Sequence, residues 1–308
     1  MRECLSKLLA DESSKDDRLI VLSGDHGYSL FDAIRKDHPT QFLNVGVAEQ
    51  NMIGLAAGLA RVGFHPCVYG LAAFVPIRVL EQIKLDLCFS RAPVILLGDG
   101  AGLVYSTLGV SHQCGEDIAC LRPLPGISIF SPCDDHELLA SWADARRWGG
   151  PSYIRIGKAD RPPVHVSPLR DTEPVRTAEG VATHGDEIVL CTGSTVHVCT
   201  QWCRLRGVAC MSVPRIKPFP TQLLPCLEQH RKAIVVEEHC RSGGLWSAIL
   251  EHCAMLPDGR RRPGRITSIA LGDEFTKTCG SYQHALGEHD MSDDRVRQRL
   301  DEWLGITF

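Results

Sequence analysis

The sequence predicts an α/β protein with a mostly parallel twisted sheet covered by helices, followed by a smaller α/β domain. Three observations lead to this fold class. Short apolar runs rich in Val, Ile and Leu alternate with amphipathic segments, the same alternation returns after a Pro-rich stretch, and 308 residues suffice for two ordinary domains. Strands that alternate with helices are typical of a parallel sheet with helices on both faces.

The first half of the chain contains six predicted strands and three predicted helices. The strands are expected at residues 18–24, 42–46, 66–70, 93–98, 127–131 and 152–156. The helices are expected at Glu49 to Arg61, Phe74 to Phe89 and Asp134 to Trp148. Asp134 has the chemistry of an N-cap, and Glu137 stands three residues later as a capping-box partner.

A Pro-rich stretch without periodicity, DRPPVHVSPLRDTEPVR, separates the two halves. We therefore expect a first domain over residues 1–160, a linker over 161–176 and a second domain over 177–308. The second half should contain strands at 187–191, 208–213, 233–238 and 266–271. Helices are expected near 194–205, 242–254 and 292–304, the last beginning at Ser292.

Composition and charge exclude several functional classes. The net charge is −4, the pI is about 6.3, and the single strong basic run is Arg260 to Pro263, so nucleic acid is not an expected partner. No apolar run approaches the roughly 18 residues of a membrane span, and the N-terminus does not resemble a secretory signal. We expect a cytoplasmic protein whose 14 cysteines are reduced. Cys199 and Cys203 have no companion ligands, so no metal site is predicted.

One carboxylate stands in an apolar stretch, FLNVGVAEQNMIGLAAGLA at residues 42–60. Glu49 follows a predicted strand and begins a helix of small and apolar residues. It can be an exposed carboxylate that interacts with the helix dipole, or a buried one that needs a specific partner. Gly54 and Gly58 lie on one face of the same helix and permit close approach of another element.

Several motifs in order carry a resemblance over nearly the whole chain. NVGVAEQNMIGLAAGLARVGFHP, FVPIRVLEQIKLD and LGVSHQCGEDIACLRPLPGISIFSPCD resemble the pyrimidine-binding domain of thiamine-diphosphate enzymes of the transketolase group, which includes 1-deoxyxylulose-5-phosphate synthase. EEHCRSGGLWSAI and GDEFTKTCGSYQHALGEHDMSDD resemble the small C-terminal domain of that group.

The resemblance gives Glu49 a partner. In the family, the matching glutamate hydrogen-bonds a ring nitrogen of the cofactor's aminopyrimidine and favours the imino tautomer that activates the thiazolium carbon. Phe74 matches an aromatic residue that stacks on the aminopyrimidine, although it can also be a core phenylalanine. Arg78 lies near the cofactor pocket in the resemblance; as a surface helix residue it would instead pair with Glu81.

Three further positions concern the substrate. His112, in GVSHQ, matches a histidine that faces the donor substrate, and Lys158 stands where transketolases place a phosphate-binding arginine. Asp99 stands near the position of a phosphate-contacting histidine, and an anion beside it would be disfavoured. Phosphorylated sugars are therefore questionable substrates, and a specialised ketose or 2-oxo-acid donor is an alternative.

The resemblance does not include the half of the family's enzymes that binds the diphosphate. In the family, a GDG followed by NN holds magnesium and the diphosphate. The GDG at residues 98–100 aligns elsewhere, and both asparagines, Asn44 and Asn51, precede it. We therefore expect a separate partner chain with GDG…NN, which would hold most of the Mg²⁺ contacts, in an α2β2 heterotetramer.

The predicted function is transfer of a two-carbon ketol unit from a ketose, or from a decarboxylated 2-oxo acid, to an aldehyde, by a two-chain transketolase-like enzyme. Two alternatives remain at this point. The chain can be the β subunit of a 2-oxo-acid dehydrogenase first component, which has the same two-domain layout. It can also be a non-catalytic scaffold subunit, against which Glu49, Phe74 and His112 together argue.

Overall fold

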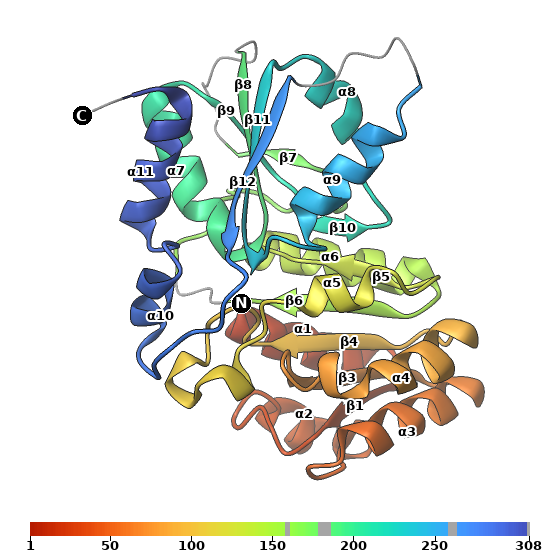
Figure 1. Cartoon of the computed structure of the whole chain (residues 1–308). Coiled ribbons are helices and arrows are strands. Elements are labelled where there is room, and N and C mark those ends of the chain that lie inside the picture. The colour runs from red at the N-terminus through yellow and green to blue at the C-terminus, as the bar shows by residue number, and fades with distance from the viewer. Residues whose placement is uncertain (158–160, 178–185, 258–263, 307–308) are drawn as a thin grey trace.

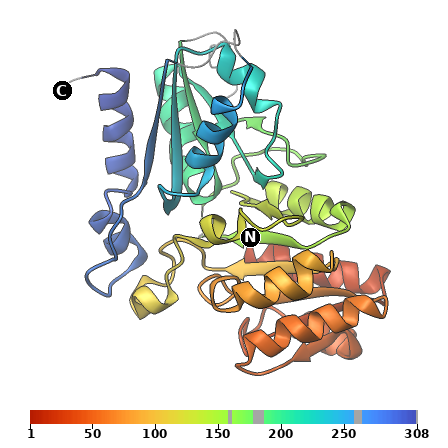
Figure 2. The ribbon, with the colours of Figure 1, turned by 45° about the vertical axis from the view of Figure 1, so that its right-hand side comes forward.

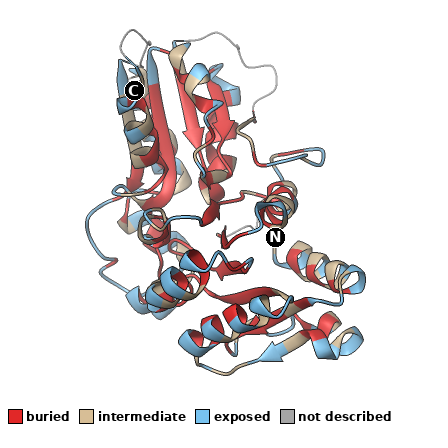
Figure 3. Ribbon diagram, turned by 90° about the vertical axis from the view of Figure 1, so that its right-hand side faces the viewer, coloured by how far each residue is buried: buried red, intermediate tan, exposed pale blue. Residues whose placement is uncertain are grey.

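Two sheets, each flanked by helices, make up the computed structural model, which describes residues 1–157, 161–177, 186–257 and 264–306 (Figure 1). The first half of the chain forms the lower part of the view and the second half forms the upper part. The central strands of both sheets are buried along most of their length, whereas edge strand β2 and the outer faces of the helices are exposed (Figure 3). No helix among the described residues is long and apolar enough to cross a membrane.

The first sheet has seven strands in the order β10-β5-β6-β4-β3-β1-β2. All neighbouring pairs are parallel except β10 with β5. The strands are β1 Leu19–Ser23, β2 Phe42–Asn44, β3 His65–Leu71, β4 Ile95–Asp99, β5 Ser128–Phe130, β6 Ser152–Ile156 and β10 Arg215–Lys217. All six strands predicted in the first half are therefore present, and the mostly parallel sheet is confirmed.

Helices cover both faces of this sheet. The elements are α1 Arg2–Lys15, α2 Asp32–Asp37, α3 Glu49–Arg61, α4 Leu80–Gln82, α5 Asp117–Leu121 and α6 Asp135–Trp148. One core joins α1, α2 and α6 to the sheet, with Leu9, Ile34 and Trp142 among its buried residues. A second core joins α3 and α5 to the opposite face, with Met52 and Ile118 buried.

The second sheet has five strands in the order β12-β11-β8-β9-β7, with β7 antiparallel to β9. The strands are β7 Val175–Arg176, β8 Glu187–Cys191, β9 Ala209–Ser212, β11 Lys232–Cys240 and β12 Arg265–Leu271. The helices are α7 Val196–Arg206, α8 Leu223–Glu228, α9 Leu245–Ala254, α10 Tyr282–Glu288 and α11 Asp293–Leu304. In Figure 1, α7 and α11 cover one face of this sheet, and α8 and α9 cover the other.

The helix predicted from Phe74 to Phe89 is wrong at its start. Phe74 lies in a turn, and the helical path begins as a 3₁₀ turn at Ile77–Val79, continues through α4 and ends as a π-helix at Ile83–Phe89. Pro76 explains the late start, because proline lacks an N–H and disfavours helical geometry in the residue before it.

Several elements were not predicted from the sequence, namely the 14-residue helix α1 and the shorter elements α2, α5, α8, α10, β7 and β10. The most consequential is β10, which lies in the second half of the sequence but pairs with β5 in the first sheet. The first sheet therefore includes a strand from the second half of the chain, and the two sheets are joined by more than the Pro-rich segment.

The cap predicted for α6 is present with a shift of one residue. Asp134 Oδ1 accepts the N–H of Glu137 at 3.1 Å, as an N-cap should. The Glu137 carboxylate does not bond the N–H of Asp134. Its Oε2 accepts the N–H of Cys133 at 2.8 Å, so the reciprocal bond of the capping box starts one residue earlier.

Candidate functional site

The predicted site residues gather at the carboxyl ends of the parallel strands of the first sheet. The loops that follow β2, β3 and β4 carry those that the structure describes, apart from Asp99, which ends β4; β1 lies between β3 and β2 in the sheet. Ligands of open α/β sheets bind outside this edge, because the strand ends leave a crevice there. The strand order thus brings residues far apart in sequence to one place.

Glu49 is the first residue of α3 and is buried, with 4% of its side chain exposed. The alternative of an exposed helix-end carboxylate is therefore wrong. Buried side chains surround it, including Met52 and Ile53 on the same helix. Such a carboxylate needs a hydrogen-bonding partner to remain charged.

Arg78 supplies that partner within the chain. Its Nη1 donates to both carboxylate oxygens of Glu49, at 3.2 Å each. The guanidinium carbon lies 4.0 Å from the centroid of the Phe74 ring, a cation–π contact. The pairing of Arg78 with Glu81, which the sequence allowed, is replaced by this longer-range pair because the late helix start turns Arg78 toward α3.

Phe74 lies at the centre of a group of rings. Its side chain is buried, and its ring contacts His112 edge to face, with the centroids 5.2 Å apart. The ring of His26 lies on another side, with its centroid 6.0 Å away. The Arg78 guanidinium completes the group. Phe74 and His112, which are distant in the sequence, therefore share one site.

His26 is a site residue that the sequence interpretation missed. Its Nε2 is buried and has no hydrogen-bond partner, although it lies beside the predicted site. The loop around it is strained, because Asp25 and Ser29 both have positive φ angles of 63° and 62°. The signal was present as SGDHGYS, a polar segment with a histidine directly after a buried strand.

Asp99 ends β4 and is buried rather than open to the crevice. Its Oδ2 accepts hydrogen bonds from the hydroxyl groups of Tyr69 at 2.8 Å and Tyr105 at 2.9 Å. Burial, followed by the nearby Asp99 charge, raises the pKa of both tyrosines, so both remain protonated donors. The carboxylate of the GDG at 98–100 is thus occupied by the hydroxyl groups of Tyr69 and Tyr105. Lys158 lies outside the described residues.

The second half of the chain holds the loop that carries His112. Thr276 Oγ1 donates to Gln113 Oε1 at 2.7 Å, directly beside His112. The backbone N–H of Leu103 donates to Glu238 Oε1 at 2.8 Å, and the N–H of Cys240 donates to the carbonyl of Gly115 at 2.6 Å. Figure 2 shows α10 and the segment before it beside this loop.

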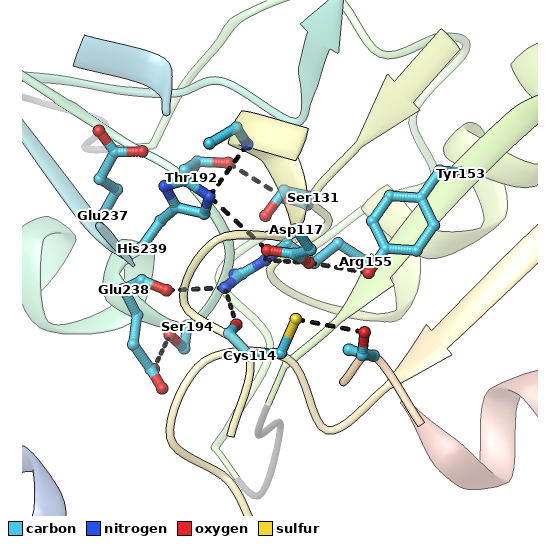
Figure 4. A network of polar contacts seen from close by, with 12 residues as sticks. Cys114, Asp117, Ser131, Tyr153, Arg155, Thr192, Ser194, Glu237, Glu238 and His239 are labelled. Atoms are coloured by element: carbon cyan, nitrogen blue, oxygen red, sulfur yellow. Dashed lines mark hydrogen bonds and ion pairs between the residues drawn. The ribbon is translucent and has the colours of Figure 1, made fainter. Parts of the chain in front are cut away.

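A buried ion pair fixes the base of the same loop (Figure 4). Arg155 Nε donates to both oxygens of Asp117, at 3.0 and 2.9 Å, and Tyr153 donates its hydroxyl to Asp117 at 2.8 Å. Arg155 Nη2 reaches the carbonyl of Glu238 on β11 at 2.7 Å. Because Arg155 and Asp117 are almost fully buried, removing either would leave an uncompensated charge between the sheets.

Two titratable groups of β11 lie at this junction with shifted pKa values. Burial lowers the pKa of His239 to about 4, which keeps the imidazole neutral. Burial also raises the pKa of Glu237 to about 7. The backbone N–H groups of Trp246 and Leu245 donate to its carboxylate and partly offset this rise. His239 Nε2 lies 3.7 Å from Asp117 and so belongs to the contact between the sheets, whereas Glu237 faces the start of α9 (Figure 4).

Family models match most of the chain. Residues 1–163 match the transketolase pyrimidine-binding domain, and residues 178–279 match the transketolase C-terminal domain. The chain is 31% identical to the B subunit of apulose-4-phosphate transketolase from Phocaeicola vulgatus, over 92% of this chain and 90% of that protein. It is 30% identical to the 6-deoxy-6-sulfo-D-fructose transketolase subunit SqwH of Clostridium sp. strain MSTE9, over 82% and 80% of the two chains.

Longer relatives and solved structures agree with this match. A 1-deoxy-D-xylulose-5-phosphate synthase of Cronobacter sakazakii is 27% identical over 96% of this chain but only 47% of its own length. A split-gene transketolase, described as an inactive β4 tetramer, superposes with a TM-score of 0.81 and 25% identity over 100% of this chain and 98% of that one. The chain covers most of the length of the relatives that are named as transketolase subunits. Because family models match both of its halves, the chain belongs to the transketolase family.

Proposed function

We propose that this chain is the pyrimidine-binding subunit of a two-chain transketolase-like enzyme, which transfers a two-carbon ketol unit from a ketose, or a decarboxylated 2-oxo acid, to an aldehyde. The observation that carries the proposal is the buried Glu49 carboxylate beside the Phe74 ring at the carboxyl ends of the strands. The family implies thiamine diphosphate as the cofactor.

The residues present fit the pyrimidine end of that cofactor. Thiamine diphosphate supplies, when bound, a carbon nucleophile that adds to the donor's carbonyl group and carries the two-carbon unit. Glu49 would accept a hydrogen bond from the aminopyrimidine ring nitrogen in a dry setting, where no water competes. The Phe74 ring would offer its face for stacking. In this chain the Arg78 guanidinium, a planar N–H donor, already makes both contacts: it bonds the Glu49 carboxylate and lies over the Phe74 ring.

Arg78 would act as an internal substitute for the cofactor ring. It bonds the carboxylate of Glu49 and covers the Phe74 face, which are the two contacts that the aminopyrimidine needs. Its side chain is 46% exposed, so it can change rotamer and move toward solvent at the edge of the site, since it is not held in a buried position. Arg78 would then remain beside the bound cofactor and keep a positive charge near Glu49.

His112 and His26 would bind the donor substrate. Both rings flank Phe74, and the Nε2 of His26 has no hydrogen-bond partner among the described residues. A donor hydroxyl or carbonyl could take that position. Asp99 would contribute by fixing Tyr105 through its hydrogen bond, and Lys158 would supply a positive charge to the substrate. The anionic sugars in the names of two relatives agree with a cationic residue at that position.

The diphosphate and Mg²⁺ would be held mainly by a separate chain with GDG…NN. The relatives named as transketolase subunits support a second chain, and the β4 assembly of the split-gene transketolase is described as inactive. We propose an α2β2 heterotetramer in which α3 faces another subunit. Gly54 and Gly58 are exposed on α3, and a Cβ built on either would meet no atom within 4 Å, so this helix face is open to close approach.

The domain limits and the location of the protein belong to the same proposal. Residues 1–160 would form the pyrimidine-binding domain, 161–176 a linker and 177–308 the C-terminal domain, close to the ranges of the two family models. None of the cysteines forms a disulfide among the described residues, which suits the reducing cytoplasm.

Reconstitution with a candidate partner chain tests the proposal. Calorimetry with thiamine diphosphate and Mg²⁺ should show weak or no binding to this chain alone and tight binding to the mixture. Ketol transfer should appear only in the mixture. Tight cofactor binding by the isolated chain would contradict the split of the site between two chains.

The same experiment separates the two alternatives. A 2-oxo-acid dehydrogenase β subunit would produce acyl transfer to a lipoyl domain, so a mixture that acylates a lipoyl domain and does not transfer ketol units would favour that function. A scaffold protein would bind its partner without completing a cofactor site. Assembly without cofactor binding would therefore support the scaffold.

A further inference from the structure

Three side chains with metal-binding atoms meet where α6, the Pro-rich segment and the second sheet come together. Cys133 and Glu137 come from the start of α6, and His165 comes from the segment after β6. One ligand atom from each, a thiol sulfur, a carboxylate oxygen and a ring nitrogen, lies within 4.8 Å of the other two. We name these three residues the Cys133 cluster. It is the one group of this kind among the described residues.

Two ligand atoms of the Cys133 cluster are buried without a hydrogen bond. Glu137 is fully buried, and its Oε1 has no hydrogen-bond partner, whereas its Oε2 accepts the N–H of Cys133. His165 is 8% exposed, and its Nε2 has no hydrogen-bond partner either. These two atoms face each other at 3.6 Å. They form an ion pair when His165 is protonated, but neither makes a hydrogen bond, so a ligand that contacts both would stabilise this buried position.

Asp134 sets the orientation of the His165 ring. Its Oδ2 lies 3.0 Å from Nδ1 of His165 and also accepts the backbone N–H of the same residue at 2.9 Å. A carboxylate at Nδ1 places the ring proton there and directs the lone pair of Nε2 toward Glu137. Carboxylates hold the ring of metal-binding histidines in this way, since the bond fixes the tautomer and raises the basicity of the other nitrogen.

The distance between Nε2 and Oε1 is too long for a hydrogen bond and is compatible with an ion pair or a shared metal ion. A protonated Nε2 bonded to Glu137 would lie about 2.9 Å from the oxygen. A nitrogen and an oxygen that bind one zinc ion, each about 2.0 Å from the metal at a tetrahedral angle, lie about 3.3 Å apart. The observed 3.6 Å is closer to the second value.

We propose that Cys133, Glu137 and His165 bind a zinc ion. Sulfur, imidazole nitrogen and carboxylate oxygen are the donor atoms that zinc takes in proteins. The thiol would bind as a thiolate and release its proton on metal binding. The fourth position would be taken by a water molecule or by the hydroxyl of Ser212 on β9, whose buried Oγ lies near Cys133 and Glu137 and has no hydrogen-bond partner.

A zinc ion here would connect two parts of the chain, or three where Ser212 is the fourth ligand. Cys133 and Glu137 belong to the first half, His165 to the Pro-rich segment and Ser212 to the second sheet. The ion would be structural and separate from the Mg²⁺ proposed for the partner chain. The spacing of the ligands in the sequence does not match a familiar motif, which is why the sequence predicted no metal site.

Metal content of the full-length chain tests the proposal. After loading with Zn²⁺ and dialysis against metal-free buffer, the wild type should retain about one zinc per chain. Replacing zinc with Co²⁺ should produce a thiolate-to-cobalt charge-transfer band. Cys133→Ser and Glu137→Gln should each lower zinc retention at least tenfold, the usual effect of losing a ligand or its support.

The matched control is Cys120→Ser, which removes a half-buried thiol on α5 outside the cluster. It should retain zinc and the cobalt band. Glu137→Gln still offers an oxygen to the N–H of Cys133, so the start of α6 should remain folded, and circular dichroism checks this. A wild-type chain that retains no zinc after loading, or a Cys133→Ser variant that retains as much as the wild type, would overturn the proposal.

Discussion

Arg78 holds Glu49 through one nitrogen that bonds both carboxylate oxygens, while its guanidinium lies on the ring of Phe74. The pair links the loop after β3 to the first residue of α3, two segments that only the fold brings together. It gives a buried carboxylate two hydrogen bonds and a cationic partner before any ligand arrives. Under the proposed function, the cofactor ring would therefore exchange one planar donor for another.

Arg78→Ala should strengthen cofactor binding by the reconstituted pair. The substitution removes a donor that competes with the cofactor for Glu49, so the cofactor-free state loses stability. A half-exposed ion pair contributes at most about 1 kcal/mol, so the cofactor Kd should fall by up to about fivefold. Calorimetry with thiamine diphosphate measures this. A weaker Kd in Arg78→Ala would show that Arg78 contributes more to the bound state than to the free one.

Glu49→Gln should lower turnover by roughly 10²- to 10⁴-fold, the range for losing a positioned acid–base group. Gln still accepts a hydrogen bond but does not stabilise a protonated ring. The fold should survive, because Arg78 is 46% exposed and water can solvate it when the carboxylate is gone. The measurement is ketol-transfer turnover of the reconstituted pair at saturating cofactor.

Proton–deuterium exchange at the thiazolium carbon provides the second readout for Glu49→Gln. Exchange should slow together with turnover, and added cofactor should not restore either rate. Fast exchange in the variant would show that Glu49 does not activate the cofactor and that its burial serves the Arg78 contact alone.

His26→Phe should lower kcat/KM for the donor substrate by about tenfold, the effect of one lost hydrogen bond of about 1.4 kcal/mol. The phenyl ring keeps the contact with Phe74 and removes the unpartnered Nε2. Cofactor affinity should not change. His38→Gln is the control, since His38 lies between α2 and β2, before the amino end of that strand and away from the site. Equal kcat/KM in His26→Phe and the wild type would exclude a contact of His26 with the donor.

The sequence predicted what depends on local pattern and missed what depends on distant contacts. The limits of α3 were predicted as observed, because its apolar residues recur with helical spacing directly after a strand. The helix after β3 was placed too early, although Pro76 indicated a later start. The strand β10 has only three residues, too few for its alternation of polar and apolar residues to identify a strand, and its partner β5 is distant in sequence.

The same distinction applies to the site. Glu49, Phe74 and His112 could be predicted because each stands in a motif of several residues. The bond between Arg78 and Glu49 could not, since it requires knowledge of where the turn at Pro76 directs the chain. His26 stands alone in its loop, and only its place beside Phe74 distinguishes it from other histidines. The Cys133 cluster likewise exists only in three dimensions.

Stability should depend on pH through Glu237, a buried carboxyl group of β11 that faces the start of α9. Burial raises its pKa from 4.5 to about 7 in the folded chain. The folded state therefore binds more protons than the unfolded state between these values. The stabilising contribution is complete below pH 4.5 and is lost as the pH rises through about 7.

Glu237→Gln should remove this dependence, because the amide resembles the protonated carboxyl group at every pH. From about pH 5 to about pH 7.5, the wild type should lose stability relative to the variant, by on the order of 2 kcal/mol, since one pKa unit corresponds to about 1.4 kcal/mol. Denaturant unfolding of the full-length chain across this range measures the difference. Glu302→Gln, at an exposed position of α11, should unfold with the wild-type pH dependence. Parallel curves for the wild type and Glu237→Gln would show that Glu237 is ionised in the folded chain throughout the range, its charge held by the N–H groups of Leu245 and Trp246.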